Sequence, residues 1–309
     1  MKIIFMGTPD FSVPILEALI QAGHEVVLTV TQPDKPKGRG KSVQFSPVKT
    51  AALAHQIKVY QPRRIREPEC VDYLKSFEAD IMVVAAFGQI LSKEILSMPK
   101  YGCVNVHASL LPKYRGASPI QWAVINGEKT TGVTTMQMDA GIDTGDILEK
   151  TEIPLADDET GGSLFDKLSE AGARLCVQTI AHMQDGTVKR TRQEDAQATH
   201  VGMITKQMGK IDWTKPAVQI ERLIRGLNPW PSAFTLLDGK MVKIWKAAVL
   251  QGADTGQAGQ IVCADKHRLI VQTGEGQLSL LEVQLEGKKR MQVDAFLRGF
   301  QVVQGQQLS

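Results

Sequence analysis

The chain has 309 residues and a mass of 33.9 kDa, which is more than one ordinary hydrophobic core supports and predicts about two domains. Apolar residues make up 43% and charged residues 22%, proportions that exclude a disordered or fibrous protein. The longest apolar runs, such as residues 81–87, are strand-sized, so no membrane-spanning helix is expected. The N-terminus lacks a signal-peptide pattern and the four cysteines are scattered, which favours a cytoplasmic protein with reduced thiols and no structural zinc.

The net charge of +3 is unevenly distributed along the chain. Residues 206–309 hold 14 Lys and Arg against 9 Asp and Glu, whereas residues 1–205 hold 22 against 24. The basic C-terminal third therefore favours a polyanionic partner for that part of the chain.

Strand and helix patterns alternate through the first two-thirds of the chain. Strands are predicted at residues 2–6, 25–30, 81–86, 103–106 and 132–138, and helices at residues 12–22 and 162–183. This alternation predicts an α/β domain over residues 1–190, with an open, mostly parallel Rossmann-like sheet covered by helices on both faces. Such sheets bind ligands beyond the carboxyl ends of their strands.

The pattern changes after residue 190. Residues 191–206 are polar and aperiodic, which predicts a linker. A helix is predicted at 217–227, followed by strands at 233–237, 241–250, 260–262, 269–273 and 278–283. Short strands separated by Gly and Asp turns predict a small antiparallel, OB-like β-barrel over residues 207–309.

Two phosphate-binding patterns and one metal-binding pattern are incomplete in this sequence. Residues 7–11 (GTPDF) follow a strand but contain one glycine, so they do not make a dinucleotide fingerprint. Residues 40–42 resemble the end of a P-loop, yet Lys35 stands where its first glycine belongs. The six histidines form no HxxxH pair, so no metal site is expected.

Two polar side chains stand together where the strand at 103–106 ends. Residues two apart on a strand face the same way, so Asn105 and His107 can point into one cleft at the carboxyl edge of the sheet. An amide N–H can stabilise a developing oxyanion, and an imidazole moves protons near neutral pH. Residues 137–146 form a second polar loop, with three acids among two glycines.

Residues 105–116 (NVHASLLPKYRG), with Asp139 and residues 143–145 (DTG) downstream, resemble the signature of folate-dependent formyltransferases. These enzymes move a formyl group from 10-formyltetrahydrofolate to an amine. Residues 7–11, the insertion at 31–41 that closes at 46–49, and the basic C-terminal barrel resemble the branch acting on methionyl initiator tRNA. Residues 211–213 and 228–231 extend the resemblance over nearly the whole chain.

The resemblance implies a catalytic domain at residues 1–190, with Asn105, His107 and Asp143 as catalytic residues and 10-formyltetrahydrofolate as the formyl donor, without a metal. Asp143 would orient the His107 ring and favour its charged form. The folate-binding residues implied by the resemblance are Phe87, Gly88, Gln89, Ile90, Leu91, Ser109, Leu110, Leu111, Pro112, Asp139 and Gly141.

The insertion at 33–49 contains five Lys or Arg and one acid, which suits a phosphate backbone. In the resembling family this loop enters the acceptor arm of the initiator tRNA, and the barrel domain, residues 207–309, would bind the same RNA. The tRNA-binding residues expected are Lys35, Lys37, Arg39, Lys41, Lys206, Lys210, Lys288 and Lys289.

The resemblance thus implies an enzyme that formylates the α-amino group of methionyl initiator tRNA for translation initiation. We expect it to be cytoplasmic and monomeric, and to act on RNA and folate and not on membranes. Two alternatives stay open: a formyltransferase for a nucleotide amino sugar, and a non-catalytic RNA-binding relative. The basic insertion disfavours the first, and the presence of all three catalytic side chains disfavours the second.

Overall fold

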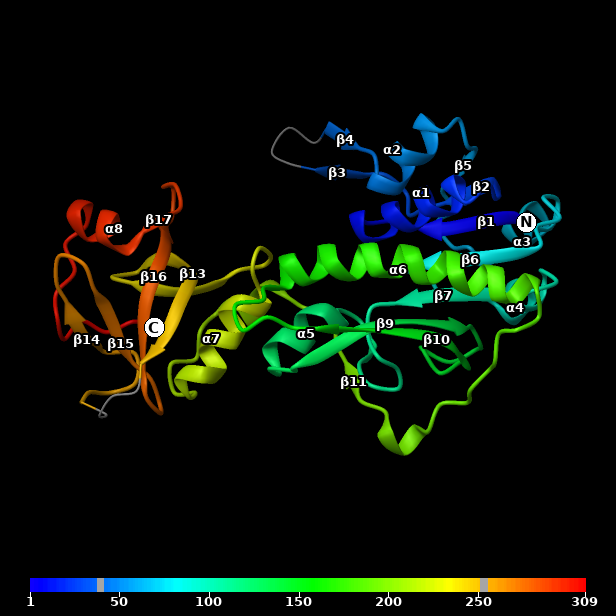
Figure 1. Ribbon diagram of the computed structural model, residues 1–309. Helices are drawn as coiled ribbons and strands as arrows, with labels where there is room; N and C mark the ends of the chain where they lie inside the picture. The colour runs from blue at the N-terminus through cyan, green and yellow to red at the C-terminus, as the bar shows by residue number, and fades with distance from the viewer. Residues whose placement is uncertain (38–41, 251–254) are drawn as a thin grey trace. The chain divides into compact units, whose positions relative to one another are not determined.

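A computed structural model describes residues 1–37, 42–250 and 255–309 of the chain (Figure 1). The described chain forms two compact units. The first consists of Met1–Pro119, Thr130–Pro154 and Phe165–Val201, and the second of Ile120–Lys129, Leu155–Leu164 and Gly202–Ser309. No helix in the described ranges is long and apolar enough to cross a membrane.

The first unit is built on a mostly parallel sheet of seven strands in the order β10-β9-β7-β6-β1-β2-β5. The strands are β1 (Lys2–Gly7), β2 (Glu25–Val30), β5 (Val59–Tyr60), β6 (Ile81–Ala85), β7 (Cys103–His107), β9 (Thr130–Gln137) and β10 (Ile147–Pro154). Strands β1, β2, β5, β6 and β7 pair in parallel, whereas β9 runs antiparallel to both of its neighbours. The predicted Rossmann-like sheet is confirmed, with two antiparallel pairings at one side.

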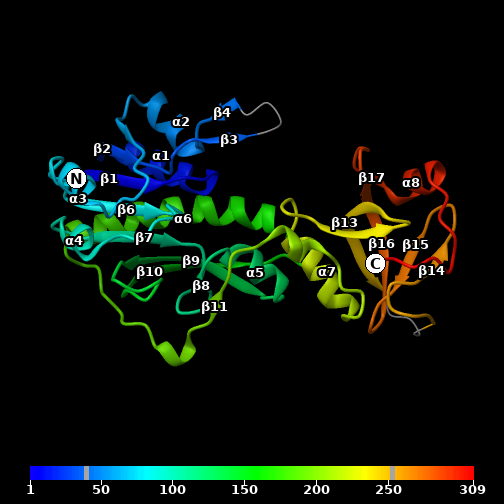
Figure 2. The same ribbon diagram turned by 180° about the vertical axis from the view of Figure 1, so that it is seen from behind.

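Helices cover both faces of this sheet because its strands are apolar on both sides. On one face, Gly172 of α6 (Gly161–Gln184) lies against Val106 and Val133 of the sheet and Ile15 of α1 (Val13–Gln21). The other face shares one core with α3 (Pro68–Lys75) and α4 (Lys93–Ser97). Helix α6 runs along the sheet in front of β6 and β7 in Figure 1 and behind them in Figure 2.

The long periodic helices were predicted more completely than the short ones. The patterns at 12–22 and 162–183 correspond to α1, which follows the short helix η1 (Asp10–Ser12), and to α6. Helices α2 (Pro47–Ala54), α3 and α4 were not predicted, and each has eight residues or fewer. Two turns of helix provide too few periodic positions to stand out from the surrounding loops.

The second unit contains an antiparallel sheet in the order β12-β13-β16-β15-β14, with β17 paired to β16. These strands are β12 (Ala233–Leu237), β13 (Lys240–Leu250), β14 (Ile261–Ala264), β15 (Leu269–Gln272), β16 (Gln277–Leu285) and β17 (Met291–Gln292). The five predicted strands lie within about three residues of the observed ones, so the antiparallel prediction is confirmed. Helix α7 (Ala217–Gly226) matches the predicted helix at 217–227, and α8 (Val293–Gly299) follows β17.

The C-terminal residues complete the barrel of the second unit. Leu236 of the edge strand β12 exchanges two backbone hydrogen bonds with Ser309, and Ile261 of the other edge strand, β14, donates to the carbonyl of Gln306. The tail therefore occupies the space between the two strands that would otherwise be open edges. One core, which includes Trp213, fills the interior of the barrel.

The smaller elements lie in the connections. A hairpin of β3 (Lys35–Lys37) and β4 (Ser42–Gln44) forms the insertion, and helix α5 (Pro119–Ile125) follows β8 (Arg115–Gly116). The segment predicted as a linker contains η2 (Asp195–Gln197), β11 (His200–Val201) and the start of η3 (Lys206–Gly209). Strand β11 pairs in parallel with β8, so residues 200–201 are tied to the segment that follows the site strand β7.

Candidate active site

Strand β7 places two predicted site residues side by side at its carboxyl end. Asn105 and His107 are both buried, with exposed fractions of 9% and 7%. They face the same side of the strand, as the alternation of strand side chains predicted. Both approach the carboxylate of Asp143, which lies in the loop after β9. The three predicted catalytic residues are therefore brought together from two separate segments of the first unit.

The ring of His107 is held by a backbone group. Its Nε2 atom lies 2.9 Å from the carbonyl oxygen of Tyr114. Because a carbonyl only accepts, Nε2 carries the proton and donates it. The Nδ1 atom lies 3.7 Å from Oδ2 of Asp143, an ion-pair distance longer than a hydrogen bond. Tyr114 thus fixes the ring, and Asp143 supplies a nearby negative charge.

The carboxylate of Asp143 is itself fixed at both oxygens. The backbone N–H of Gly116 donates to Oδ2 at 2.8 Å, and the amide of Asn105 donates to Oδ1 at 3.4 Å. The backbone of Asp143 is in the left-handed region, with φ of 54°. This conformation is uncommon for a residue with a side chain and marks a loop that its surroundings hold in place.

The first group of predicted folate-binding residues, 87–91, lies just beyond the carboxyl end of β6. Phe87 belongs to the core, and its carbonyl accepts from the hydroxyl of Thr8 and the amide of Gln32. Gln89 binds back to the loop at residues 62–65 through both ends of its amide. Ile90, by contrast, is 65% exposed. This group is thus largely built into the fold, and Ile90 offers apolar surface outward.

The second group lies after β7 and after β9. Ser109 is buried and donates to the carbonyl of Lys113, while Leu111 packs in a small core with Met136 and Ile147. Leu110 and Pro112 are half-buried beside them. Gly141 is exposed in the loop of residues 137–146, here called the acidic loop. Asp139 accepts from the N–H of Gly141 and the hydroxyl of Thr144, so its side chain shapes that loop from within.

The predicted tRNA-binding residues lie in two places. Lys35 and Lys37 are on β3, and Arg39 and Lys41 fall outside the residues that the structure describes. At the base of the insertion, Lys49 forms an ion pair of 2.5 Å with Asp34. Two of the charges counted in the insertion therefore neutralise each other, and its basic character rests on the residues between them.

The remaining four predicted tRNA-binding residues are exposed on the second unit: Lys206, Lys210, Lys288 and Lys289. Lys210 lines a hollow of about 540 Å³ together with Lys215, Arg222 and Asp212. On the barrel, the Arg290 guanidinium lies 4.7 Å from the ring centroid of Trp245. Trp213 is buried in the core of the second unit, whereas Trp230 is 54% exposed.

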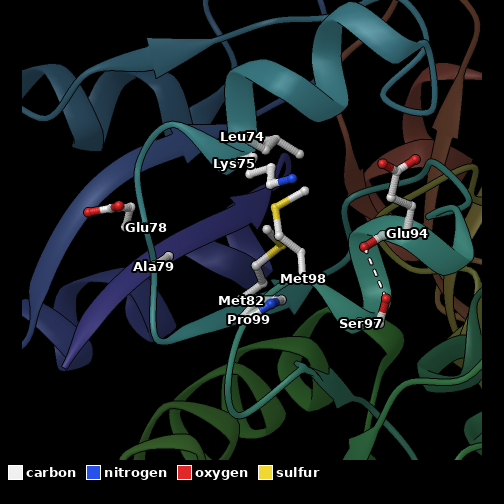
Figure 3. Close-up of a pocket in the computed structure, with 9 residues that line it drawn as sticks. All are labelled: Leu74, Lys75, Glu78, Ala79, Met82, Glu94, Ser97, Met98 and Pro99. Atoms are coloured by element: carbon white, nitrogen blue, oxygen red, sulfur yellow. Dashed lines mark hydrogen bonds between the residues drawn. The ribbon is translucent and has the colours of Figure 1, made fainter.

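A second cavity lies in the first unit, at the edge of the sheet opposite the candidate site. It has a volume of about 430 Å³ and lies beside the amino end of β6. The side chains of Met82, Met98 and Leu74 contribute to its lining (Figure 3). Its described lining includes none of the predicted site residues. The described residues also hold no group of three side chains suited to a metal.

Sequence reasoning missed several residues that shape the site. The backbone groups of Tyr114 and Gly116 contact the side chains of His107 and Asp143, which are predicted to be catalytic, but backbone contacts carry no residue-type signal. Gln193 is buried in the segment predicted as a linker and donates to the carbonyls of Asp143 and Gly145. A single glutamine between charged residues carries no sequence signal that would predict such a contact.

Curated proteins of similar sequence match this chain along its full length. It is 64% identical over 305 residues to the methionyl-tRNA formyltransferase of Agathobacter rectalis, covering 99% of this chain and 98% of that protein. The methionyl-tRNA formyltransferase of Caldanaerobacter subterraneus is 49% identical over 306 residues, with 99% of each chain covered.

Solved structures share the fold at lower identity. A sugar 3N-formyl transferase, crystallised in the presence of dTDP and 5-N-formyl-THF, superposes with a TM-score of 0.67 at 21% identity, covering 94% of this chain and 99% of that one. An N-formyltransferase from Helicobacter canadensis, in complex with folinic acid and dTDP-3-aminofucose, has a TM-score of 0.66 at 20% identity, covering 91% and 98%.

Two family models divide the chain between them. The formyl transferase model matches residues 1–180, and the model of the formyl transferase C-terminal domain matches residues 203–301. The first covers the sheet with Asn105 and His107 and the loop with Asp143, and the second covers the barrel. The chain therefore belongs to the formyl transferase family.

Proposed function

We propose that this protein transfers the formyl group of 10-formyltetrahydrofolate to the α-amino group of methionyl initiator tRNA, giving the N-formylmethionyl-tRNA that starts translation. The observation that carries the proposal is the convergence of Asn105, His107 and Asp143 at the carboxyl edge of the sheet. Relatives of up to 64% identity named methionyl-tRNA formyltransferase support the choice of acceptor.

The proposed reaction forms one N–C bond and breaks another. The folate supplies a formyl group on a nitrogen that departs as tetrahydrofolate. The attacking amine must lose a proton, the departing folate nitrogen must gain one, and negative charge gathers on the formyl oxygen while the new bond forms. Protein groups are therefore needed for that oxygen and for that proton.

Asn105 is suited to bind the formyl oxygen. Its amide has two N–H groups, and only one of them is directed to Asp143. The second can donate to the oxygen as its negative charge grows. Because the side chain is buried, this hydrogen bond acts with little screening by water.

His107 is suited to take the amine proton at Nδ1. The donation from Nε2 to Tyr114 leaves Nδ1 as the ring atom with a free lone pair. Once Nδ1 is protonated, the carboxylate of Asp143 at 3.7 Å stabilises the positive ring. Asp143 therefore acts as a fixed counter-charge, with its own position held by the N–H of Gly116.

The two loops beside this centre fit a folate. Ile90 and Ile142, one in each loop, are both 65% exposed, and such apolar surface suits the flat faces of a pterin. The hydrogen-bonding edge of the pterin would bind to backbone N–H and C=O groups of three segments, residues 87–91, 109–112 and 139–141. We propose these segments as the folate site, within the domain of residues 1–190.

The acceptor tRNA would be held by basic residues of the insertion and of the barrel domain, residues 207–309. Exposed lysines at 206, 210, 288 and 289 are suited to phosphate contacts, which carry affinity but not sequence. We further propose that the protein works as a monomer in the cytoplasm, where its two substrates are found. Size-exclusion chromatography with light scattering tests the monomeric state.

One assay tests the whole proposal. Purified protein is given 10-formyltetrahydrofolate with methionyl initiator tRNA, methionyl elongator tRNA or a nucleotide amino sugar in parallel. We expect rapid formylation of the initiator tRNA, with much lower kcat/KM for the other two. Equal or better use of the sugar would contradict the proposal, and absence of transfer to any acceptor would favour a non-catalytic RNA-binding role.

A further inference from the structure

A buried glutamine joins the predicted linker to the candidate active site. Gln193 has an exposed fraction of 6%, although Arg192 and Glu194 on either side are exposed. A polar side chain is buried only where its hydrogen-bonding groups are satisfied. The hydrogen bonds of Gln193 therefore indicate which parts of the site the segment after residue 190 supports.

The orientation of the Gln193 amide is determined by its neighbour Arg115. The guanidinium of Arg115 is buried and donates from both Nε and Nη2 to Oε1 of Gln193, at 3.0 and 2.9 Å. A guanidinium has no acceptor, so only the oxygen of the amide can face it. The exposed carboxylate of Asp195 receives a further N–H of Arg115 at 2.9 Å.

The nitrogen of the same amide is consequently directed at the acidic loop. Nε2 of Gln193 donates to the backbone carbonyls of Asp143 at 2.9 Å and of Gly145 at 2.7 Å. These carbonyls flank Thr144 and hold the turn in which Asp143 has its left-handed backbone. Both N–H groups of the amide are thus used to fix the loop that carries the proposed counter-charge of His107.

The same segment supports His107 from the other side. The hydroxyl of Thr199 accepts from the N–H of Tyr114, and the carbonyl of Thr199 accepts from the N–H of Arg115. Tyr114 is the residue whose carbonyl holds Nε2 of His107. Gln193 and Thr199 therefore brace the two segments that position the carboxylate and the imidazole.

We propose that Gln193 is a positioning residue for catalysis, which acts through Asp143 and is held in its working orientation by Arg115. The inference rests on the proposed function, because it assigns Gln193 to the centre formed by Asn105, His107 and Asp143. Gln193 has no role in binding either substrate: its amide is consumed by Arg115 and by the two loop carbonyls. Its loss should lower kcat and leave the KM values for folate and tRNA nearly unchanged.

The test uses a substitution that preserves size and reverses hydrogen bonding. Gln193→Glu keeps an oxygen toward Arg115 but sets a second carboxylate oxygen, with no proton to donate, against two carbonyls. We expect kcat to fall by about 10-fold to 100-fold, the usual scale for removing a group that orients a catalytic residue. Gln197→Glu, the same substitution at an exposed position of this segment, is the matched control and should leave kcat unchanged.

A double-mutant cycle separates this role from a general structural one. In an Asp143→Asn background, adding Gln193→Glu should cost less than twofold in kcat, because the residue through which Gln193 acts is already disabled. Effects that multiply in the double variant would overturn the proposal. So would a kcat of Gln193→Glu within twofold of the unsubstituted protein.

Gln193→Met serves as a second variant, with similar length and no hydrogen-bonding groups at its end. It should lose kcat to a similar degree while its thermal unfolding shows a folded protein. If neither variant folds, Gln193 is required for the fold itself and the positioning role is wrong. The unsubstituted protein is measured alongside, and its failure to formylate methionyl initiator tRNA would contradict the proposed function instead.

Discussion

The Nε2 atom of His107 donates to the backbone carbonyl of Tyr114 at 2.9 Å, so the proton-accepting atom of the ring is the one that faces Asp143. This arrangement predicts a single catalytic unit. His107→Ala should lower kcat by about 100-fold or more, the scale expected for losing an acid–base group. Steady-state kinetics with methionyl initiator tRNA measures this loss.

Asn105→Ala and Asp143→Asn should each cause a loss of similar size, and double variants should lose less than the product of the single effects. Circular dichroism of each variant provides the folding control. Near-normal turnover of a folded His107→Ala variant would contradict the assigned mechanism.

The Asp34–Lys49 ion pair predicts a pH-dependent contribution to stability. Hydrogen bonds from Lys49 and then from Gln61 lower the pKa of Asp34 below its ordinary value. A carboxyl with a depressed folded-state pKa stabilises the fold above its unfolded value, about 4, and loses that contribution as the pH falls through the folded value. Asp34→Asn should therefore be destabilised at pH 7 by about 1.5 kcal/mol, and the difference should shrink between pH 5 and pH 3.

Urea unfolding at several pH values measures this difference. Asp157→Asn is the control, because its pair with Lys129 is 3.4 Å long and both side chains are largely exposed. It should show no comparable change in stability. A loss in Asp34→Asn that stays constant down to pH 3 would rule out the ion pair as its source.

The basic insertion predicts a loss specific to tRNA. Arg39 stands between two glycines at the centre of the insertion, where a guanidinium can bind either phosphates or base edges. Arg39→Ala should reduce kcat/KM for methionyl initiator tRNA and leave folate binding intact. Lys93→Ala, at an exposed position on α4, is the matched control. If kcat/KM for the tRNA is the same in both variants, the insertion does not recognise RNA.

The cysteines predict selective thiol reactivity. Burial raises the pKa values of Cys103 and Cys176 to about 12, so neither forms a thiolate near neutral pH. Cys263 is only half-buried on β14. A disulfide reagent at pH 8 should therefore modify Cys263 first, and a Cys263→Ser variant should lose that fast phase. Reaction of Cys103 or Cys176 in the folded protein at the same rate would contradict this order.

Local periodicity accounts for what the sequence predicted well. The strand alternation that places Asn105 and His107 on one face depends only on neighbouring residues, and so does the periodicity of α6. The contacts of Phe87 and Gln193 depend instead on segments far along the chain. Phe87 packs in the core although it stands in a turn, and Gln193 is buried although its segment has the composition of a linker. Long-range packing of this kind is not encoded in local pattern.

The last strand of the first sheet has a consequence for self-association. Strand β10 lies at the edge of the sheet, and its sequence carries Glu149, Lys150 and Glu152 before ending at Pro154. An unpaired edge can recruit a strand from another molecule, and charges and proline oppose such recruitment. The charged residues and the terminal proline of β10 therefore make the addition of a strand from another molecule less favourable at this edge.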